Sequence, residues 1–484
     1  MDQKKELEKW FANTADLKIE HVDELNGRIR LYYLSTMADQ GYIRKELLPK
    51  LKRLDLSQVT IMDVEIVVGA TVEQRVSRQG EVVGRLIDGD IFIHVEGEKY
   101  GISIPADASK ERSITPPEIE ANVLGPQIAF VESLATNISI IRKYLPTPQL
   151  IYENQQVGQI DKTDVAILYL DQIANEQNVQ IARQRICDIT VDRVIDAYTL
   201  AQLIEDNSYT IFPQLQITQR PDRVVAGLTD GQVVILVDGS PFAIAGPTNL
   251  MQFLQAAEDF YFRWSIATFL RVLRLIAIVL SLLLAPAYVA TLTFHYEMIP
   301  VKMLIQLSQS RARVPFPPLM EALMLEGIIE LLREAGARLP TKVGQTIGIV
   351  GGIVIGQAAV QAGFTSNILI IIVALGALSS FIAPSYVLGS AIRVIRFPMI
   401  FLAGIWGGIG IAVGFSFLIS HLLLQTSFGR PFLEPVYPMR ILDLKDSIIR
   451  LPLQWFSYRP VFLRTKDEMR FTPNEAFKKQ DIDE

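Results

Sequence analysis

The chain has 484 residues, of which 50% are hydrophobic and 20% charged, and its formal net charge is −6. This length is too great for one ordinary domain, and the acidic balance gives no support to a role in nucleic-acid binding. The single cysteine, Cys187, excludes an intrachain disulfide and a cysteine-based zinc site, and we expect it to be a small buried residue. The N-terminal segment MDQKKELEKWFANT has no apolar core typical of a signal peptide. We therefore expect the first half of the chain to lie in the cytoplasm.

The composition changes sharply near residue 264. Charged residues occur throughout the chain before this point, and long stretches almost free of charge follow it. We predict an α/β cytoplasmic N-terminal region, then an all-α multi-span membrane domain, and a short cytoplasmic tail. The predicted limits are residues 263–427 for the membrane domain and 428–484 for the tail.

The N-terminal region contains a repeated pattern. Residues 88–105 read DGDIFIHVEGEKYGISIP and residues 230–247 read DGQVVILVDGSPFAIAGP, and both predict a β-hairpin. Upstream, the segments that begin at Arg28 and Asp164 each show a buried-strand pattern followed by an amphipathic helix pattern. The same order in both copies predicts two related α/β subdomains. We place them at residues 1–110 and 127–262, joined by a proline-rich linker at 111–126.

No catalytic pattern is visible in the N-terminal region. The four histidines of the chain, His21, His94, His295 and His421, share no ligand spacing. Neither a phosphate loop of the GxxxxGK type nor a GxGxxG after a strand occurs, and the Asp-Gly pairs are explained by turns. We therefore expect no enzymatic activity, no cofactor and no metal site.

Four segments after residue 264 are long and apolar enough to cross about 30 Å of hydrocarbon. They lie at about 272–292, 343–363, 367–389 and 397–424. Arginines at the start of the first segment indicate that it begins in the cytoplasm, and Pro384 is expected to break or kink the third. We place both termini in the cytoplasm and expect four to six spans.

The second of these segments carries glycines four residues apart. At about 3.6 residues per turn they share one narrow face of a helix, and such a face lets another helix approach closely. We predict helix packing at Gly344, Gly348, Gly352 and Gly356. The opposite face is predicted to line a pore, with Thr346, Val350, Val354, Gln357 and Gln361. The alternative is a tightly packed transmembrane helix with two buried glutamines.

Residues 297–338 form an amphipathic or re-entrant segment that carries several carboxylates: Glu321, Glu326, Glu330 and Glu334. Carboxylates at membrane depth are costly, and where they occur they face protein or water. In one interpretation the helix lies at the membrane surface with its glutamates solvated. In the other it is embedded, and the four glutamates line a candidate cation path.

Residues of about 111–455 resemble the A subunit of the spore germinant receptors, the GerA type. The resemblance rests on phrases that occur in the family's order, including GPQIAFVESLATNISIIR, AEDFYFRW, FHYEMIP, GQTIGIVGGIVIGQAAV and QTSFGRPF. It implies a homo-oligomer in the endospore inner membrane that conducts ions and starts germination. It also implies two partners, a transporter-like B subunit that binds the nutrient and a lipoprotein C subunit.

Two other functions compete with this one. A related spore-stage V A-type membrane protein, which amplifies ion release, shares the membrane motifs, although QTSFGRPF and LREAGARLP favour the receptor subunit. A secondary transporter would suit helices broken near Pro384 and Pro398 and intramembrane glutamates. A membrane-anchored enzyme has the least support, because no catalytic residues are apparent.

Overall fold

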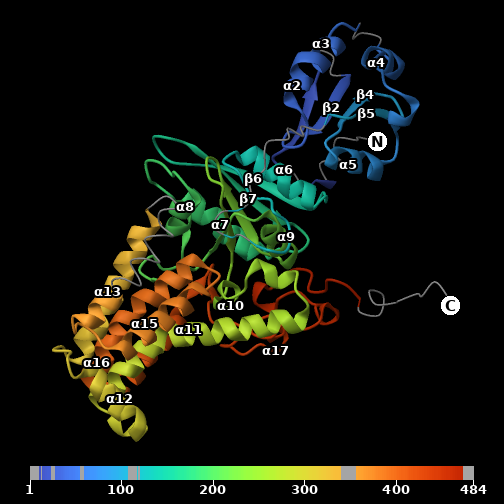
Figure 1. The fold of residues 1–484 in the computed structure, drawn as a ribbon. Helices are drawn as coiled ribbons and strands as arrows, with labels where there is room; N and C mark the ends of the chain where they lie inside the picture. The colour runs from blue at the N-terminus through green and yellow to red at the C-terminus, as the bar shows by residue number, and fades with distance from the viewer. Residues whose placement is uncertain are drawn as a thin grey trace.

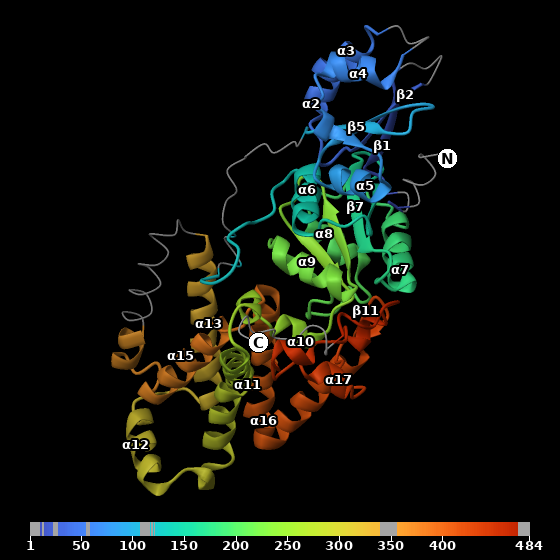
Figure 2. The same cartoon turned by 90° about the vertical axis from the view of Figure 1, so that its right-hand side faces the viewer.

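The computed structural model describes residues 10–11, 14–22, 28–54, 59–106, 117, 120, 122–338 and 356–472. Three bodies follow one another along the molecule: a first α/β subdomain at one end, a second α/β subdomain in the middle, and a helical bundle at the other end (Figures 1 and 2). The C-terminal tail returns from the bundle to the second subdomain.

The first subdomain is built on a five-stranded antiparallel sheet of order β1-β2-β4-β5-β3. Its strands are β1 (Leu17–His21), β2 (Ile29–Leu34), β3 (Arg75–Val76), β4 (Ile91–Val95) and β5 (Gly101–Ile104). One face packs against α2 (Gln40–Tyr42), η1 (Ile43–Leu47), α3 (Leu48–Leu51) and α4 (Ile61–Val68), and the other against α5 (Gln79–Ile87). The short turn η2 (Val72–Gln74) precedes β3.

The second subdomain repeats this sheet with the order β6-β7-β9-β10-β8. Its strands are β6 (Leu150–Val157), β7 (Thr163–Leu170), β8 (Gln216–Thr218), β9 (Val233–Val237) and β10 (Ala243–Gly246). Its helices are α6 (Leu134–Tyr144), α7 (Glu176–Cys187), α8 (Ala197–Ile204), α9 (Pro221–Asp230), α10 (Leu250–Phe253) and η3 (Ala257–Phe260). The hairpins predicted from the repeated Asp-Gly segments are confirmed as β4–β5 and β9–β10.

The alternation of side chains explains why the second sheet is covered on both faces. All five residues of β9 are buried, and successive side chains of a strand point to opposite faces. Val233, Ile235 and Val237 pack with α7 and α8, whereas Val234 and Leu236 pack with α6 and α9. A central strand buried on both sides therefore needs the uninterrupted apolar sequence VVILV.

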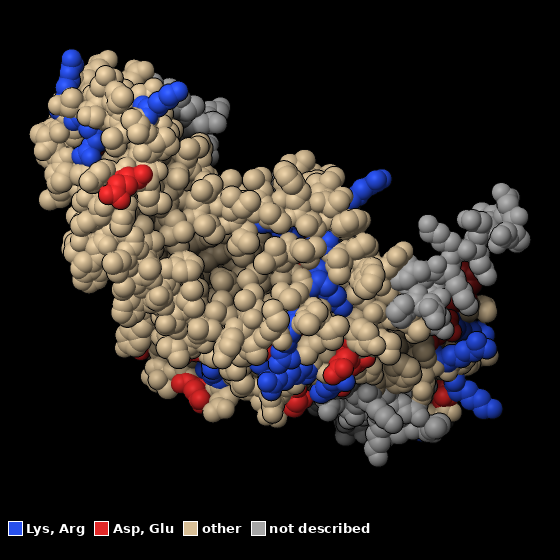
Figure 3. All heavy atoms as spheres, turned by 90° about the horizontal axis from the view of Figure 1, so that it is seen from below, with Lys and Arg blue, Asp and Glu red and all other residues tan. Residues whose placement is uncertain are grey.

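The helical bundle contains α11 (Trp264–Thr293), α12 (Val301–Arg311), α13 (Pro318–Ala337), α15 (Asn367–Phe381) and α16 (Tyr386–Leu424), with the short turn η4 (Tyr296–Met298). Among the described residues, α11 and α16 are long and apolar enough to cross a membrane. Helix α11 packs along both α15 and α16. Few charged side chains appear on the part of the surface that these helices form in Figure 3.

Helix α16 folds back on itself at Gly407, where the backbone is non-helical, with φ 59° and ψ −136°. A Cβ on Gly410 would lie 2.0 Å from the carbonyl oxygen of Leu402, although in a straight helix residues eight apart are separated by about 12 Å. The segment 397–424, predicted to be one span, is therefore not one continuous helix, because the chain forms two antiparallel arms, 386–406 and 408–424. The break expected at Pro384 is present between α15 and α16, whereas Pro398 lies inside the first arm.

The tail contains β11 (Thr426–Ser427), β12 (Arg430–Pro431), α17 (Ile441–Leu444), η5 (Leu453–Trp455) and η6 (Val461–Leu463). Phe428, which follows the second arm of α16, is buried in the core of the second subdomain. The tail therefore ties the end of the bundle to the sheet that precedes it.

Candidate functional site

A buried arginine joins the four main helices of the bundle. Arg396 of α16 donates to the Glu326 carboxylate of α13 at 2.7 Å, to the Ser281 hydroxyl of α11 at 2.5 Å and to the Gly376 carbonyl of α15 at 3.3 Å. Arg396 and Glu326 are each 1% exposed. We call these four residues the Arg396 node.

The node leaves two polar atoms without a hydrogen bond. Among the described residues, neither Nε of Arg396 nor Oε1 of Glu326 has a partner. Removing two charges from water costs several kcal/mol per ion, and only good geometry and further hydrogen bonds offset that cost. Burial of the node therefore carries a large desolvation cost, and such buried ionisable groups are candidates for a functional role.

A second group of charges extends from the node along one face of α13. Glu330 and Arg333 lie four and seven residues after Glu326, and this spacing places all three on one side of the helix. The Glu330 carboxylate lies 3.3 Å from Arg333 and 3.5 Å from Arg393 of α16. Arg333 also donates to Ser380 of α15 at 3.1 Å.

A third contact links the start of α13 to the start of α15. The Glu321 carboxylate, 1% exposed, accepts hydrogen bonds from the Ser366 backbone N–H at 2.6 Å and the Thr365 hydroxyl at 3.1 Å. Arg311 of α12 lies 3.5 Å from the same carboxylate. A negative charge is favourable at the amino end of a helix, so Glu321 stabilises the position where α15 begins.

The four glutamates named from the sequence thus occupy different environments. Glu321 and Glu326 are buried, Glu330 is partly buried, and Glu334 is exposed beside Arg338. Each carboxylate has an arginine nitrogen within 3.5 Å: Arg311, Arg396, Arg333 and Arg338, respectively. Each of the four carboxylates therefore has a cationic partner within the chain, and Glu334 is the most exposed of them.

Most of the predicted pore and packing residues lie outside the described residues: Thr346, Val350, Val354, Gly344, Gly348 and Gly352. Of the others, Gln357 and Gln361 are exposed on a helical turn that precedes α15. A Cβ on Gly356 would meet none of the described atoms within 4 Å.

A buried carboxylate holds the N-terminal part of α11 in place. Asp259, in η3, lies 2.5 Å from Arg274 and 3.1 Å from Arg271, and it is fully buried. Arg271 also pairs with Asp446 of the tail at 2.9 Å. Arg271 and Arg274, at the start of the first predicted span, thus have partners in the second subdomain and the tail.

A second carboxylate holds the end of α16. Asp206 accepts backbone hydrogen bonds from Phe428 at 2.9 Å and Gly429 at 2.8 Å, and it also pairs with Arg185 at 2.6 Å and with the Thr426 hydroxyl. Burial alone would raise the pKa of Asp206. The hydrogen bonds from Thr426 and Gly429 and the charge of Arg185 outweigh this effect, so the pKa is lowered.

We expect Asp206→Asn to destabilise the junction at neutral pH by about 1–3 kcal/mol, because the new amide cannot accept all four bonds. A depressed folded-state pKa gives stability that is present above the ordinary aspartate pKa, about 3.9, and is lost as the pH falls through the folded value. Thermal unfolding of the detergent-solubilised chain should therefore show a difference from wild type at pH 7 that shrinks in acid. Asp188→Asn, at the exposed end of α7, is the control, and a difference independent of pH would contradict the assignment.

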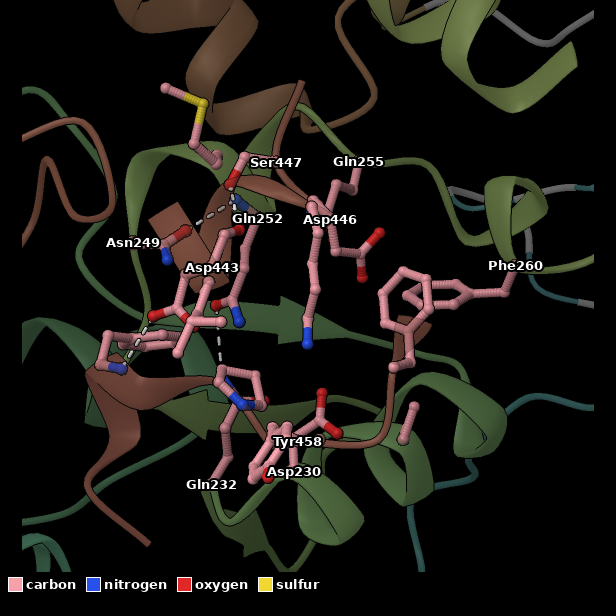
Figure 4. Close-up of a pocket in the computed structure, with 18 of the residues that line it drawn as sticks. Asp230, Gln232, Asn249, Gln252, Gln255, Phe260, Asp443, Asp446, Ser447 and Tyr458 are labelled. Carbon is pink, nitrogen blue, oxygen red and sulfur yellow. Dashed lines mark hydrogen bonds between the residues drawn. The ribbon is translucent and has the colours of Figure 1, made fainter. Parts of the chain in front are cut away.

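The tail also encloses a small cavity against the second subdomain. The cavity has a volume of about 80 Å³. Carboxylates and amides of its lining are visible in Figure 4, at Asp230, Gln232, Gln252 and Asp446. Burial raises the pKa of Asp230 to about 6, and Arg470 of the tail pairs with it. The cavity is part of the contact that holds the tail to α9.

Sequence patterns did not identify the partners of these charges. Arg393 and Arg396 lie within an apolar run, and an arginine in such a run indicates a buried partner without identifying it. Asp206 lies in a loop, and Asp259 lies in the short turn η3, within the phrase AEDFYFRW, which by itself does not indicate an ion-pair partner. Cys187, expected to be buried, is exposed at the end of α7, because its neighbours Ile186 and Ala182 form the buried face of that helix.

These features describe a protein with two α/β subdomains and a charged helical bundle that contains two helices able to cross a membrane. The family model of the Bacillus/Clostridium GerA spore germination protein matches residues 5–462. The chain belongs to this family, and the resemblance drawn from the sequence is confirmed.

Several curated relatives are similar over most of their length. Spore germination protein GerQA of Bacillus cereus is 47% identical over 94% of this chain and 91% of its own. Spore germination protein A1 of Bacillus subtilis (strain 168) is 38% identical over 89% of each chain. The solved N-terminal domain of the A subunit of the Bacillus megaterium spore germinant receptor GerK3 is 26% identical, with a TM-score of 0.37, over 51% of this chain and 93% of that one.

Proposed function

We propose that this chain is the A-type subunit of a nutrient germinant receptor in the endospore inner membrane. It assembles with further copies of itself into an ion channel, and the channel opens when a partner subunit binds nutrient. A transporter-like B subunit and a lipoprotein C subunit are the partners. Membership of the GerA family and the names of the relatives as spore germination proteins support this role.

The arrangement of the bundle supports a multi-pass topology with both termini in the cytoplasm. The start of α11 and the end of α16 both contact the second subdomain, through Asp259 and Asp206. At about 1.5 Å per residue, the first arm of α16 is about 30 Å long, enough to cross the hydrocarbon core. We therefore count the arms of α16 as separate spans.

The Arg396 node is the observation that carries the channel proposal. Charged groups buried among membrane helices mark ion paths or the switches that control them. In the paired arrangement the carboxylates of α13 are neutralised, which suits a closed state. A ligand shifts a protein from a closed to an open conformation only by binding the open one more tightly. We propose that Arg396 has different hydrogen-bond partners in these two conformations. We assign the pore wall itself to residues 343–363.

The proposal is tested by ion flux through liposomes that contain the chain and both partner subunits. Nutrient should start the flux, and Val354→Trp or Gln357→Trp should strongly reduce it because a bulky ring fills a narrow pore. Leu331→Trp, on the exposed surface of α13, is the matched control and should leave the flux unchanged. Flux that persists in both pore variants would remove the pore assignment, and uptake of a substrate coupled to an ion gradient would favour a transporter.

A further inference from the structure

A cleft of about 480 Å³ lies between the second subdomain and the turn that joins α15 to α16. Tyr198, Ala201, Gln202 and Glu205 line one wall. Their spacing places them on one face of α8 and the residue that follows it. The turn contributes Ser385 and Tyr386 to the opposite side. The volume falls within the usual range of about 300–1,000 Å³ for ligand sites.

Glu205 places in this cleft a carboxyl group that has no ion-pair partner among the described residues. Its carboxylate accepts the backbone N–H of Gln214, and no ion pair to Glu205 occurs in the described part of the chain. The two other acidic residues nearby are paired, Glu120 with Arg223 at 3.2 Å and Asp206 with Arg185. Burial is the main reason that the pKa of Glu205 is raised to about 7. A bound cation would offset this unfavourable desolvation of the carboxylate.

Aromatic rings surround the rest of the cleft. Tyr198 and Phe242 pack edge to face with ring centroids 5.0 Å apart, and Phe212 and Phe253 also line the space. The faces of aromatic rings attract an ammonium group, and their area suits an apolar body attached to it. A metal ion prefers oxygen, nitrogen or sulfur ligands, so the aromatic lining favours an organic ammonium ion over a metal ion.

We propose that this cleft binds a small organic ammonium ion, with Glu205 as the anionic partner of the nitrogen and the Tyr198–Phe242 pair against the apolar body. The site is separate from the Arg396 node and does not depend on ion conduction by the chain. The ammonium group can belong to a free solute or to the head group of a lipid, since α16 begins at the cleft. The ligand would touch the second subdomain and the bundle at once, and would favour the arrangement of the two that keeps the walls together.

The test measures binding of benzylamine to the full chain in an uncharged maltoside detergent at pH 8, by calorimetry. Glu205→Gln should weaken the affinity about tenfold or more, through loss of one charge-assisted hydrogen bond. Glu73→Gln, on the exposed turn η2 of the first subdomain, should leave it unchanged. Benzyl alcohol, which has the same ring without the charge, should not compete.

The pH dependence gives a second readout. Lowering the pH from 8 to 6 should weaken benzylamine binding to wild type, because Glu205 takes up a proton in this range, and should not affect Glu205→Gln. That variant keeps an acceptor for Gln214 and removes a poorly solvated charge, so we expect it to fold. Phe242→Leu, which leaves the carboxylate in place, should also weaken binding.

The source of the ammonium group is distinguished in nanodiscs. If the lipid head group is the natural ligand, phosphatidylethanolamine should reduce benzylamine binding relative to nanodiscs of phosphatidylglycerol alone. If a free solute is the ligand, the two lipids should give the same affinity. Equal affinity of wild type and Glu205→Gln for benzylamine, or equal binding of benzyl alcohol and benzylamine, would overturn the proposal.

Discussion

Replacing Arg396 by methionine is expected to lower the free energy of unfolding by about 3–5 kcal/mol, the effect of leaving one member of a buried pair without its partner. Glu326 would then be an unpaired carboxylate at 1% exposure, and Ser281 would lose its donor. Thermal unfolding of the detergent-solubilised chain, followed by tryptophan fluorescence, measures the change.

Two further variants separate the charge effect from a packing effect. The double variant Arg396→Met with Glu326→Met should recover most of the lost stability, since an apolar pair of similar volume avoids the desolvation cost. Arg338→Met breaks the exposed pair with Glu334 and should change the stability by at most about 1 kcal/mol. Equal effects of Arg396→Met and Arg338→Met would mean that the node is not buried in the folded protein.

Gly410→Ala is also expected to be strongly destabilising and to lower the free energy of unfolding by about 1–3 kcal/mol or more. The added Cβ would lie 2.0 Å from the Leu402 carbonyl oxygen, and a backbone atom cannot move aside as a flexible side chain can. The arms of α16 would have to separate, and the contact between Gly408 and His295 at the tip would be disturbed. The same thermal unfolding measurement reports the change.

Gly327→Ala is the matched control for this helix glycine. Gly327 lies inside α13, and no described atom lies within 4 Å of the added Cβ. The substitution should therefore stabilise the helix by up to about 1 kcal/mol. Unaltered stability of Gly410→Ala would contradict the folded-back arrangement, because in a straight helix residues 402 and 410 do not touch.

The parts of the fold that follow from local patterns were predictable. Apolar strands joined by an acidic residue and a glycine predicted both hairpins. The strand-then-helix patterns after Arg28 and Asp164 correspond to β2 with α2–α3 and to β7 with α7. These patterns depend on residues close together in the chain. The two five-stranded sheets have the same strand order because the strand and helix segments occur in the same order in both subdomains.

Features that depend on distant residues were not predictable in this way. The reversal at Gly407 lies within an apolar run that resembles one continuous helix. It packs against Phe294 and His295, which follow α11 and are more than 110 residues away in sequence. The partners of Arg396 are 70 and 115 residues away in sequence. Periodicity identifies which face of a helix is apolar, but it does not identify the residue that a buried charge meets on another helix.

The assignment of the ion path to residues 343–363 is tested most directly by single-cysteine accessibility. The background is Cys187→Ser, since Cys187 is exposed, and the chain is reconstituted with both partner subunits, with and without nutrient. We predict that cysteines at 346, 350, 354, 357 and 361 react with a water-soluble reagent, that those at 344, 348, 352 and 356 do not, and that nutrient changes the rates. Lack of reaction on either face would contradict the pore assignment and direct the search for the ion path to the glutamates of α13.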